Sequence, residues 1–243
     1  MAQFNLKIAD HVGRVHSLFE STKDYCHNYL TEEDAEFEVV VTSEDLAFEQ
    51  AELLAEAKAE GMKPRKFTDP FLDRAAIQRK FADYLFGHNV LLCHGSTVAV
   101  DGKAYLFTAK CGTGKSTHTR LWREIFGDRV RMVNDDKPFL ILTDSGVLAC
   151  GAPWSGKHGL NSNITVPLAG VCILERGPEN IIRPIPAADA LPRLLHETHC
   201  PTGQEARFHE LVERLAAQTN LWRMECTKDR EAAEVAHRFM SSI

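Results

Sequence analysis

The sequence predicts an α/β fold with a mixed sheet and with a glycine-rich loop between two of its hairpins. Strand-turn-strand patterns at 97–108 and 139–150, with Asp-Gly and Asp-Ser-Gly turns, predict two antiparallel hairpins. Between them, residues 109–116 read AKCGTGKS and precede a helical segment at 117–126. A loop that joins a strand to a helix in this way is typical of α/β proteins. The sheet is therefore expected to contain antiparallel pairs as well as parallel strands.

The composition excludes several protein classes. The chain has 243 residues, 44% of them hydrophobic, and a net charge of −6, as in an ordinary globular protein of one or two domains. This charge gives no reason to expect a nucleic acid or membrane surface as partner. The longest apolar runs, such as 39–41 and 139–142, fall far short of the roughly 18 residues of a membrane-spanning helix. Seven cysteines without a C-x-x-C pair, and no secretory signal pattern, indicate reduced thiols in a cytoplasmic protein.

The charge is distributed unevenly. Residues 1–60 hold 14 acidic and 4 basic side chains, a net charge of −10, and the rest of the chain carries +4. This division indicates an N-terminal α+β region at 1–87 and a catalytic domain at 88–243. The alternative is an acidic, solvated outer layer without a separate role.

The N-terminal region reads as short strands followed by helices. Residues 37–41 (FEVVV) predict a strand, and Thr42 with the acidic residues after Ser43 predicts the start of a helix that ends at Gly61. A second helix is expected to begin at Asp69-Pro70, because proline is tolerated at the first helical position. Gly87 is expected to end it.

The remaining elements follow from apolar runs and turn residues. Strands are expected at 89–93, 129–134, 164–174 and 221–226, and helices at 189–196, 204–219 and from Asp229 onward.

Residues 109–116 match the Walker A pattern, with Ala109 in place of the first glycine. Gly112 and Gly114 allow backbone N–H groups to curl around an anion, and the helix that follows directs its positive dipole end at phosphates. Lys115 would neutralise the β- and γ-phosphates, and the Ser116 hydroxyl would bind Mg²⁺. The residues expected to contact the nucleotide are Cys111, Gly112, Thr113, Gly114, Lys115, Ser116 and Thr117.

Two adjacent carboxylates, Asp135 and Asp136, follow the expected strand at 129–134. A metal–phosphate centre needs one oxygen ligand for Mg²⁺ and one proton acceptor for an incoming hydroxyl. Successive side chains of a regular strand point to opposite faces, so the chain must bend at 135–136 if both are to reach the phosphates.

These motifs, in the order His94-Gly95, Asp-Gly hairpin, Gly112–Thr117 loop and Asp135-Asp136, resemble the catalytic domain of the HPr kinase/phosphorylase family, which shares a P-loop fold with phosphoenolpyruvate carboxykinase. The resemblance covers about residues 88–175. It implies a mixed sheet, ATP with Mg²⁺, and phosphoryl transfer to a serine-type hydroxyl. It also implies Asp135 as proton acceptor, His94 as its polar partner, and Asp136 with Ser116 as metal ligands; the two aspartates can exchange roles.

The acceptor of the phosphate stays open between a protein, a peptide and a metabolite. Residues 151–159 form a second glycine-rich loop whose Lys157 and His158 are candidates for holding this acceptor. Arg176 and Arg183 are weaker candidates for stabilising transition-state charge. Two other functions remain possible, a nucleotide-gated regulatory module without phosphotransfer and a carboxykinase-related enzyme. An oligomer is possible as well.

Overall fold

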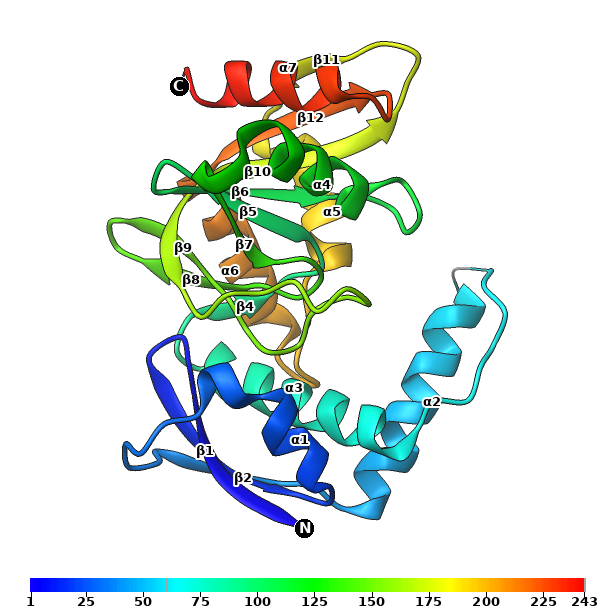
Figure 1. Cartoon of the computed structure of the whole chain (residues 1–243), viewed down its shortest axis with the longest axis vertical. Coiled ribbons are helices and arrows are strands. Elements are labelled where there is room, and N and C mark those ends of the chain that lie inside the picture. Colours follow the sequence, from blue (N-terminus) through cyan, green and yellow to red (C-terminus); the bar gives the residue numbers. More distant parts are fainter. Residues whose placement is uncertain (60, 243) are drawn as a thin grey trace. The chain divides into compact units, whose positions relative to one another are not determined.

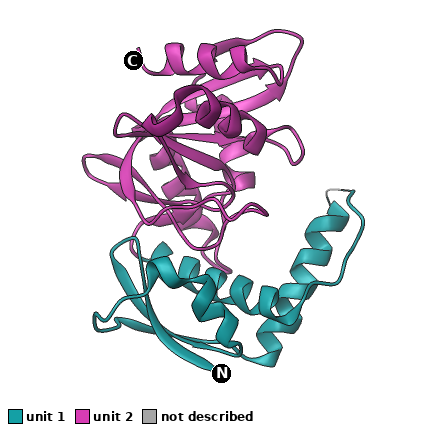
Figure 2. Ribbon diagram, in the orientation of Figure 1, with its two compact units in different colours: residues 1–87 teal, residues 88–243 magenta. Residues whose placement is uncertain are grey.

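A computed structural model describes residues 1–59 and 61–242 of the chain. The described chain divides into two compact units, residues 1–87 and residues 88–243 (Figure 2).

The first unit combines a three-stranded sheet with helices. Strand β1 (Ala2–Ile8) pairs antiparallel with β2 (His11–Ser17), and β3 (Phe37–Val40) pairs parallel with β2. The β1–β2 turn places Ala9 and Asp10 at φ of 52° and 64°, the left-handed region that tight hairpin turns require. Neither residue is glycine, so the sequence pattern did not single out this hairpin. Helix α1 (Glu20–Tyr25) and a 3₁₀ turn, η1 (His27–Tyr29), follow β2.

Two longer helices complete this unit. Helix α2 (Ser43–Ala59) begins where the sequence predicted, because Thr42 and Asp45 bond each other's backbone N–H groups. Helix α3 (Asp69–Phe86) carries Pro70 in its first turn and ends before Gly87, as expected.

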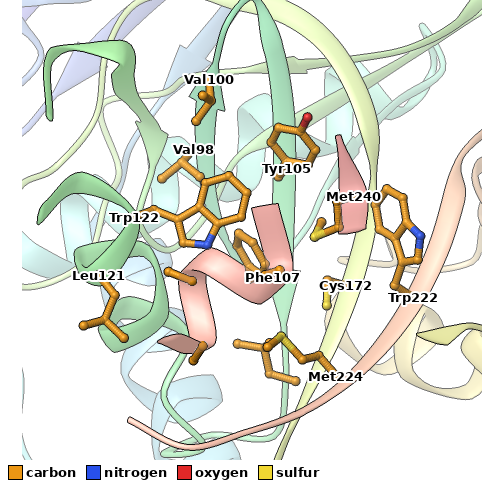
Figure 3. Packing of buried hydrophobic residues seen from close by; sticks show 14 of the residues in the cluster. Val98, Val100, Tyr105, Phe107, Leu121, Trp122, Cys172, Trp222, Met224 and Met240 are labelled. Atoms are coloured by element: carbon orange, nitrogen blue, oxygen red, sulfur yellow. The ribbon is translucent and has the colours of Figure 1, made fainter. Parts of the chain in front are cut away.

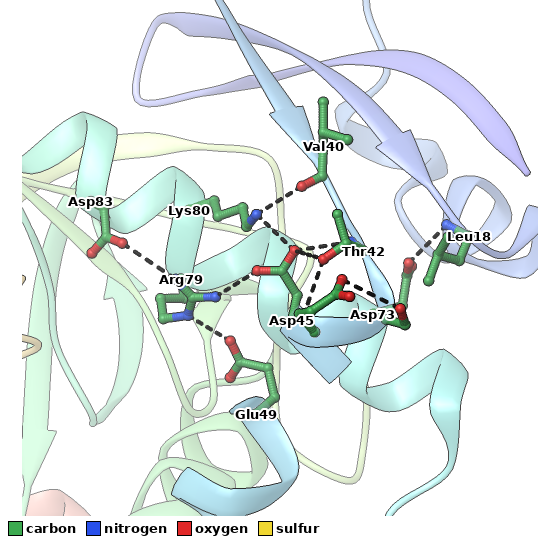
Figure 4. A network of polar contacts seen from close by, with 11 residues as sticks. Leu18, Val40, Thr42, Asp45, Glu49, Asp73, Arg79, Lys80 and Asp83 are labelled. Atoms are coloured by element: carbon green, nitrogen blue, oxygen red, sulfur yellow. Dashed lines mark hydrogen bonds and ion pairs between the residues drawn. The ribbon is translucent and has the colours of Figure 1, made fainter. Parts of the chain in front are cut away.

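Charged side chains join α2 to α3 (Figure 4). The guanidinium of Arg79 lies 3.1 Å from Asp45 and 2.6 Å from Glu49, and Lys80 Nζ lies 2.8 Å from the other oxygen of Asp45. Glu49 is buried, so its partner in α3 offsets the cost of removing this carboxylate from water.

Asp73 of α3 anchors the chain that follows β2. This carboxylate is completely buried and accepts hydrogen bonds from the hydroxyls of Ser17 and Thr22, both at 2.6 Å. It also accepts the backbone N–H of Leu18 at 2.9 Å (Figure 4). Three donors therefore depend on one acceptor.

In the described part of the second unit, nine strands form a mixed sheet in the order β4-β8-β9-β10-β6-β5-β7, and β12 and β11 join it beside β10 (Figure 1). Their bounds are β4 (Val90–Leu92), β5 (Ser96–Val100), β6 (Lys103–Thr108), β7 (Val130–Asn134), β8 (Phe139–Thr143), β9 (Gly146–Cys150), β10 (Thr165–Arg176), β11 (Ile181–Pro184) and β12 (Asn220–Cys226). Both expected hairpins are present, β5–β6 and β8–β9. Parallel pairing occurs between β10 and β6 and between β10 and β12. The expected mixed α/β fold is confirmed.

Helices pack on this sheet. The helices of the second unit are α4 (Lys115–Phe126), α5 (Ala187–Glu197), α6 (Glu205–Gln218) and α7 (Arg230–Met240), and a 3₁₀ turn, η2 (Gly127–Arg129), follows α4. Asp229 caps α7 by accepting the N–H of Ala232. Helices α4 and α7 share a buried cluster with β5, β6, β10 and β12 that includes Trp122, Phe107 and Met224 (Figure 3). Helix α6 packs against β8, β9 and β12.

The topology gathers several strand ends at one edge of the sheet. Strands β6, β10 and β12 are mutually parallel, and β7 runs in the same direction because both β6 and β7 pair antiparallel with β5. Their carboxyl ends therefore lie at the same edge, where ligands bind in open α/β sheets.

We predict that Asp73→Ala lowers the free energy of unfolding of the first unit by about 2–4 kcal/mol, because the buried hydroxyls of Ser17 and Thr22 and the partly buried N–H of Leu18 lose their acceptor. Urea denaturation followed by circular dichroism measures this difference. Asp83→Ala, on the same helix, is the matched control, because Asp83 forms an (i, i+4) ion pair with Arg79 at 3.7 Å and is well exposed. It should cost no more than about 0.5 kcal/mol. Equal costs for the two variants would contradict the anchoring role of Asp73.

Candidate functional site

The glycine-rich loop connects β6 to α4 in a conformation that depends on its glycines. Gly112 and Gly114 have φ of +74° and +129°, which side-chain-bearing residues rarely adopt. The N–H of Thr113 donates to Lys110 O at 3.1 Å and closes the turn. Helix α4 starts directly after Gly114, so its first-turn N–H groups, which have no partner within the helix, border the loop. The loop thus has the form that binds phosphate groups.

Lys115, Ser116 and Thr117 occupy the first turn of α4. The ammonium of Lys115 donates to Ala109 O at 3.1 Å and so lies across the loop. Ser116 is exposed, and Thr117 is half-buried. Cys111 is exposed at the tip of the loop.

Arg176, at the end of β10, holds the loop from its other side. Its guanidinium donates to the carbonyl oxygens of Gly112 and Thr113. In a trans peptide the N–H points opposite to the carbonyl, so the N–H of Gly114 points away from Arg176. Arg176 therefore contacts the face of the loop opposite to the Gly114 N–H. Arg183, the other arginine considered from the sequence, lies on strand β11.

Asn134, the last residue of β7, holds the bend that the chain makes at Asp135 and Asp136. Its side chain is completely buried. Its Oδ1 accepts the backbone N–H groups of Asp136 at 2.9 Å and Lys137 at 2.8 Å. Its Nδ2 donates to Ala152 O at 3.0 Å and Trp154 O at 2.9 Å. One carboxamide therefore fixes the turn after β7 and the start of the second glycine-rich loop.

Asp135 is almost completely buried, with 4% of its surface exposed. Its Oδ1 accepts the N–H of Gly156 at 2.6 Å, so the second glycine-rich loop covers this carboxylate. A Cβ at position 156 would lie 3.2 Å from both carboxylate oxygens, which leaves little room for any other residue. Burial raises the pKa of Asp135; the Gly156 hydrogen bond opposes this shift, and the charge of Asp136 adds to it. A carboxylate with a raised pKa is a better proton acceptor.

His94 lies between two carboxylates. Its Nε2 is 3.4 Å from Asp136 Oδ1, and its Nδ1 is 3.0 Å from Glu197 Oε2. Arg193 holds the other oxygen of Glu197 at 2.9 Å. The structure thus brings His94 into contact with Asp136, and not with the carboxylate of Asp135, as its partner.

The charges of this cluster stabilise one another. Burial alone would lower the pKa of His94, but its hydrogen bonds to Asp136 and Glu197 outweigh burial and raise it. Burial alone would raise the pKa of Glu197, but His94 and Arg193 lower it to about 2. Burial likewise opposes ionisation of Asp136, but the hydrogen bond from His94 and the charges of Lys137, His94 and Lys115 lower its pKa. The ammonium of Lys115 therefore lies within electrostatic reach of the acidic cluster.

Sequence reasoning missed Glu197, although it is 7% exposed and contacts His94. The segment at 197–199 pairs with residues 92–94, since His94 N donates to Glu197 O and His199 N donates to Leu92 O. More than 100 residues separate the partners, and no local motif marks a glutamate at the end of a helix as a functional residue.

The second glycine-rich loop is fixed at its base and exposed further along. A Cβ on Gly151 would lie 1.9 Å from Ser162 O, so only glycine fits there. Lys157 and His158 are exposed. The charge of His158 lowers the pKa of Asp135, which places His158 near that carboxylate. No described contact joins Lys157 to the other predicted residues.

The residues present fit a Mg²⁺–nucleotide complex. No group of three or more His, Cys, Asp or Glu side chains that could hold a metal ion occurs within 1–59 and 61–242. Mg²⁺ does not require such a group, because it is usually bound by one or two carboxylates together with substrate phosphates and water. An ionised Asp136 near the Lys115 loop is a donor of this kind.

No protein-family model matches the chain, and no curated protein matches it. Among solved structures, the chain is similar to the HPr(Ser) kinase/phosphatase from Coxiella burnetii, with a TM-score of 0.36 and 10% identity. This similarity covers 63% of the present chain and 99% of the other. Among the described helices, none is both long and apolar enough to cross a membrane.

We predict that Asn134→Asp lowers the free energy of unfolding by about 2–4 kcal/mol, because a buried carboxylate would face the carbonyl oxygens of Ala152 and Trp154. Differential scanning calorimetry at neutral pH measures this effect. Asn161→Asp is the matched control, because Asn161 is only partly buried and its amide donates to Ser155 Oγ at 2.9 Å but to the carbonyl oxygens of Pro153 and Gly159 only at 3.4 and 3.5 Å. An effect at position 134 no larger than that at 161 would argue against the role of Asn134.

We predict that Glu197→Gln destabilises the protein by about 2–4 kcal/mol between pH 4.5 and 6.5. The lowered pKa of Glu197 gives stability above pH 4.5 that is lost as the pH falls toward about 2. The raised pKa of His94 gives stability below pH 6.5 that is lost as the pH rises through its folded-state pKa. The difference between wild type and variant should therefore shrink on both sides of this window. Urea denaturation across pH 3–9 measures it, and a pH-independent difference would be inconsistent with this ion pair.

Proposed function

We propose that the second unit is an ATP- and Mg²⁺-dependent kinase that transfers the γ-phosphate to a serine-type hydroxyl. The observation that carries this proposal is that Lys115 of the glycine-rich loop lies within electrostatic reach of Asp136, the second of the two carboxylates that follow β7. A phosphate-binding loop alone supports nucleotide binding. The buried Asp135, next to Asp136 in the chain, would add a proton acceptor, which phosphoryl transfer to a hydroxyl uses.

The roles of the residues follow from their surroundings. The loop 111–117 and Lys115 would hold the phosphates of ATP. Asp136 and the Ser116 hydroxyl would hold Mg²⁺, which when bound neutralises charge that develops on the phosphates. His94 and Glu197 keep Asp136 ionised and oriented for that purpose.

Asp135 is the favoured proton acceptor of the two aspartates. Its raised pKa and burial suit a base that takes a proton from a hydroxyl, whereas the lowered pKa of Asp136 suits a metal ligand. This division matches what the resemblance to the HPr kinase/phosphorylase family implies. The finer fold class, a P-loop domain of the kind found in that family and in phosphoenolpyruvate carboxykinase, is part of the same proposal.

The acceptor would approach beside the second glycine-rich loop. Gly156 already hydrogen-bonds Asp135, and the exposed His158 lies near it. Loops at such positions commonly carry the specificity of an enzyme. We therefore expect Lys157 and His158 to contact the acceptor, whether it is a protein, a peptide or a metabolite.

Asp135→Asn is expected to reduce phosphate transfer by about 10²–10⁴-fold, because general base catalysis contributes about this much. Binding of Mg-ATP should stay within a few-fold of wild type. Transfer is measured with γ-labelled ATP and fractionated cell extract, followed by identification of the labelled species. Lys115→Ala should instead abolish ATP binding. Asp144→Asn, the same change at a fully exposed turn, is the matched control and should leave ATP binding and phosphate transfer unchanged.

Three outcomes would count against this proposal. Normal transfer by Asp135→Asn would show that the base is wrongly assigned. Tight ATP binding without a labelled product in any fraction would favour a nucleotide-gated regulatory module. Label that appears only with oxaloacetate as acceptor would favour a carboxykinase.

A further inference from the structure

The exposed part of the second glycine-rich loop is a short turn beside Asp135. The N–H of Gly159 donates to Gly156 O at 2.9 Å, so residues 156–159 form a β-turn, in which Gly159 has a φ of +63°. Lys157 and His158 are the two central residues of this turn. Within residues 151–160, only 157–159 are exposed. The turn therefore presents the side chains of Lys157 and His158 to solvent.

Both ends of this turn are fixed to the end of β7. Before the turn, Gly156 N donates to Asp135 Oδ1 at 2.6 Å. After the turn, Leu160 O accepts the backbone N–H of Asp135 at 3.1 Å. The Cα of Lys157 lies about 3.8 Å beyond the Cα of Gly156, so a small molecule can span the distance from the Lys157 ammonium to the Asp135 carboxylate.

The cations around the two aspartates are not equally engaged. The hydrogen bond from His94 and the charges of Lys137 and Lys115 lower the pKa of Asp136, so the charge of Asp136 is balanced within the protein. Lys157, in contrast, forms no ion pair and no side-chain hydrogen bond within residues 1–59 and 61–242. An unpaired ammonium beside the proposed proton acceptor is placed to bind an anionic group of the acceptor molecule.

The burial of Asp135 limits which acceptor can reach its carboxylate. Only 4% of this residue is exposed, and Gly156 hydrogen-bonds one of its oxygens. A serine hydroxyl lies one carbon from the backbone, so a folded protein substrate would have to bring its main chain against the covered carboxylate. A small molecule can reach the same point without a main chain.

We propose that the acceptor is a small hydroxyl compound of net negative charge, and that Lys157 and His158 bind its carboxylate or phosphate group. This inference rests on the proposed function and narrows its acceptor. In the transfer, the acceptor oxygen forms a bond to the γ-phosphorus as the bond from that phosphorus to the β–γ bridging oxygen breaks. ADP leaves with the bridging oxygen, and the hydroxyl proton passes to Asp135. The Lys157 ammonium supplies a charge-assisted hydrogen bond to the anionic group, and the His158 ring supplies a second donor.

Fractionation of a cell extract tests the class of acceptor. The extract is divided by a membrane that retains proteins, and the filtrate is passed over an anion-exchange resin at neutral pH. Each fraction is then incubated with the full chain, Mg²⁺ and γ-labelled ATP. Labelled product should arise from the small molecules that the resin retains.

The outcomes separate this inference from the proposed function. Product that arises only from the protein fraction, or only from small molecules that the resin does not retain, would overturn the inference while the kinase stands. No product from any fraction would count against the kinase itself, and the inference would fail with it.

Variants of the turn test the role of Lys157 with the acceptor identified in this way. Lys157→Ala should raise the KM for that acceptor by roughly 10- to 100-fold, the effect of losing one charge-assisted hydrogen bond, and should leave the KM for ATP unchanged. Lys157→Arg should restore most of the affinity, because it keeps the charge. Lys103→Ala removes an exposed lysine at the start of β6 and is the matched control, which should change neither constant.

Two results with Lys157→Ala would contradict this role. A rise in the KM for ATP without a rise in the KM for the acceptor would place Lys157 on the phosphates of the nucleotide. Unchanged values of both constants would show that the anionic group binds elsewhere.

Discussion

The geometry of the candidate site depends on the hydrogen bonds of the Asn134 carboxamide. Its oxygen bonds two successive N–H groups of the turn at 135–137, and its nitrogen bonds two carbonyls of the loop that covers Asp135. A side chain with both donors and acceptors is required, because the same buried point must satisfy groups of opposite polarity. Through this residue, the end of β7 positions both aspartates and the second glycine-rich loop at 151–159.

The surroundings of the two aspartates that Asn134 positions also set their pKa values. Asp135 and Asp136 are adjacent in sequence but lie in different environments, so their pKa values shift in opposite directions. Asp136 faces the His94–Glu197 pair, whose hydrogen bond, together with the charges of Lys137 and Lys115, outweighs burial, whereas at Asp135 burial outweighs the hydrogen bond from a backbone N–H. Two carboxylates whose surroundings separate their pKa values are the usual basis for separate acid–base and electrostatic roles.

Much of the fold follows from local sequence signals. Both hairpins of the second unit, the helix after the glycine-rich loop and the starts of α2 and α3 are where turn and capping residues predicted them. The β1–β2 hairpin and the edge strand β11 were not singled out, because their turns lack a strong signal and β11 is short. The assigned roles of the site residues stay predictions, although His94, Lys115 and Asp136 lie close enough to influence one another's charge.

The sequence by itself determined the glycine-rich loop and the pair of carboxylates, because loop conformation and dipole orientation depend on residues that are neighbours in the chain. Tertiary structure decided which residues act with them. Glu197 reaches His94 only because residues 197–199 pair with residues 92–94, and Arg176 reaches the loop only because β10 lies parallel to β6. A pocket of about 160 Å³ beside the loop is likewise lined by residues from the ends of β10 and β12. Contacts between distant segments are set by the packing of the sheet, which no local pattern encodes.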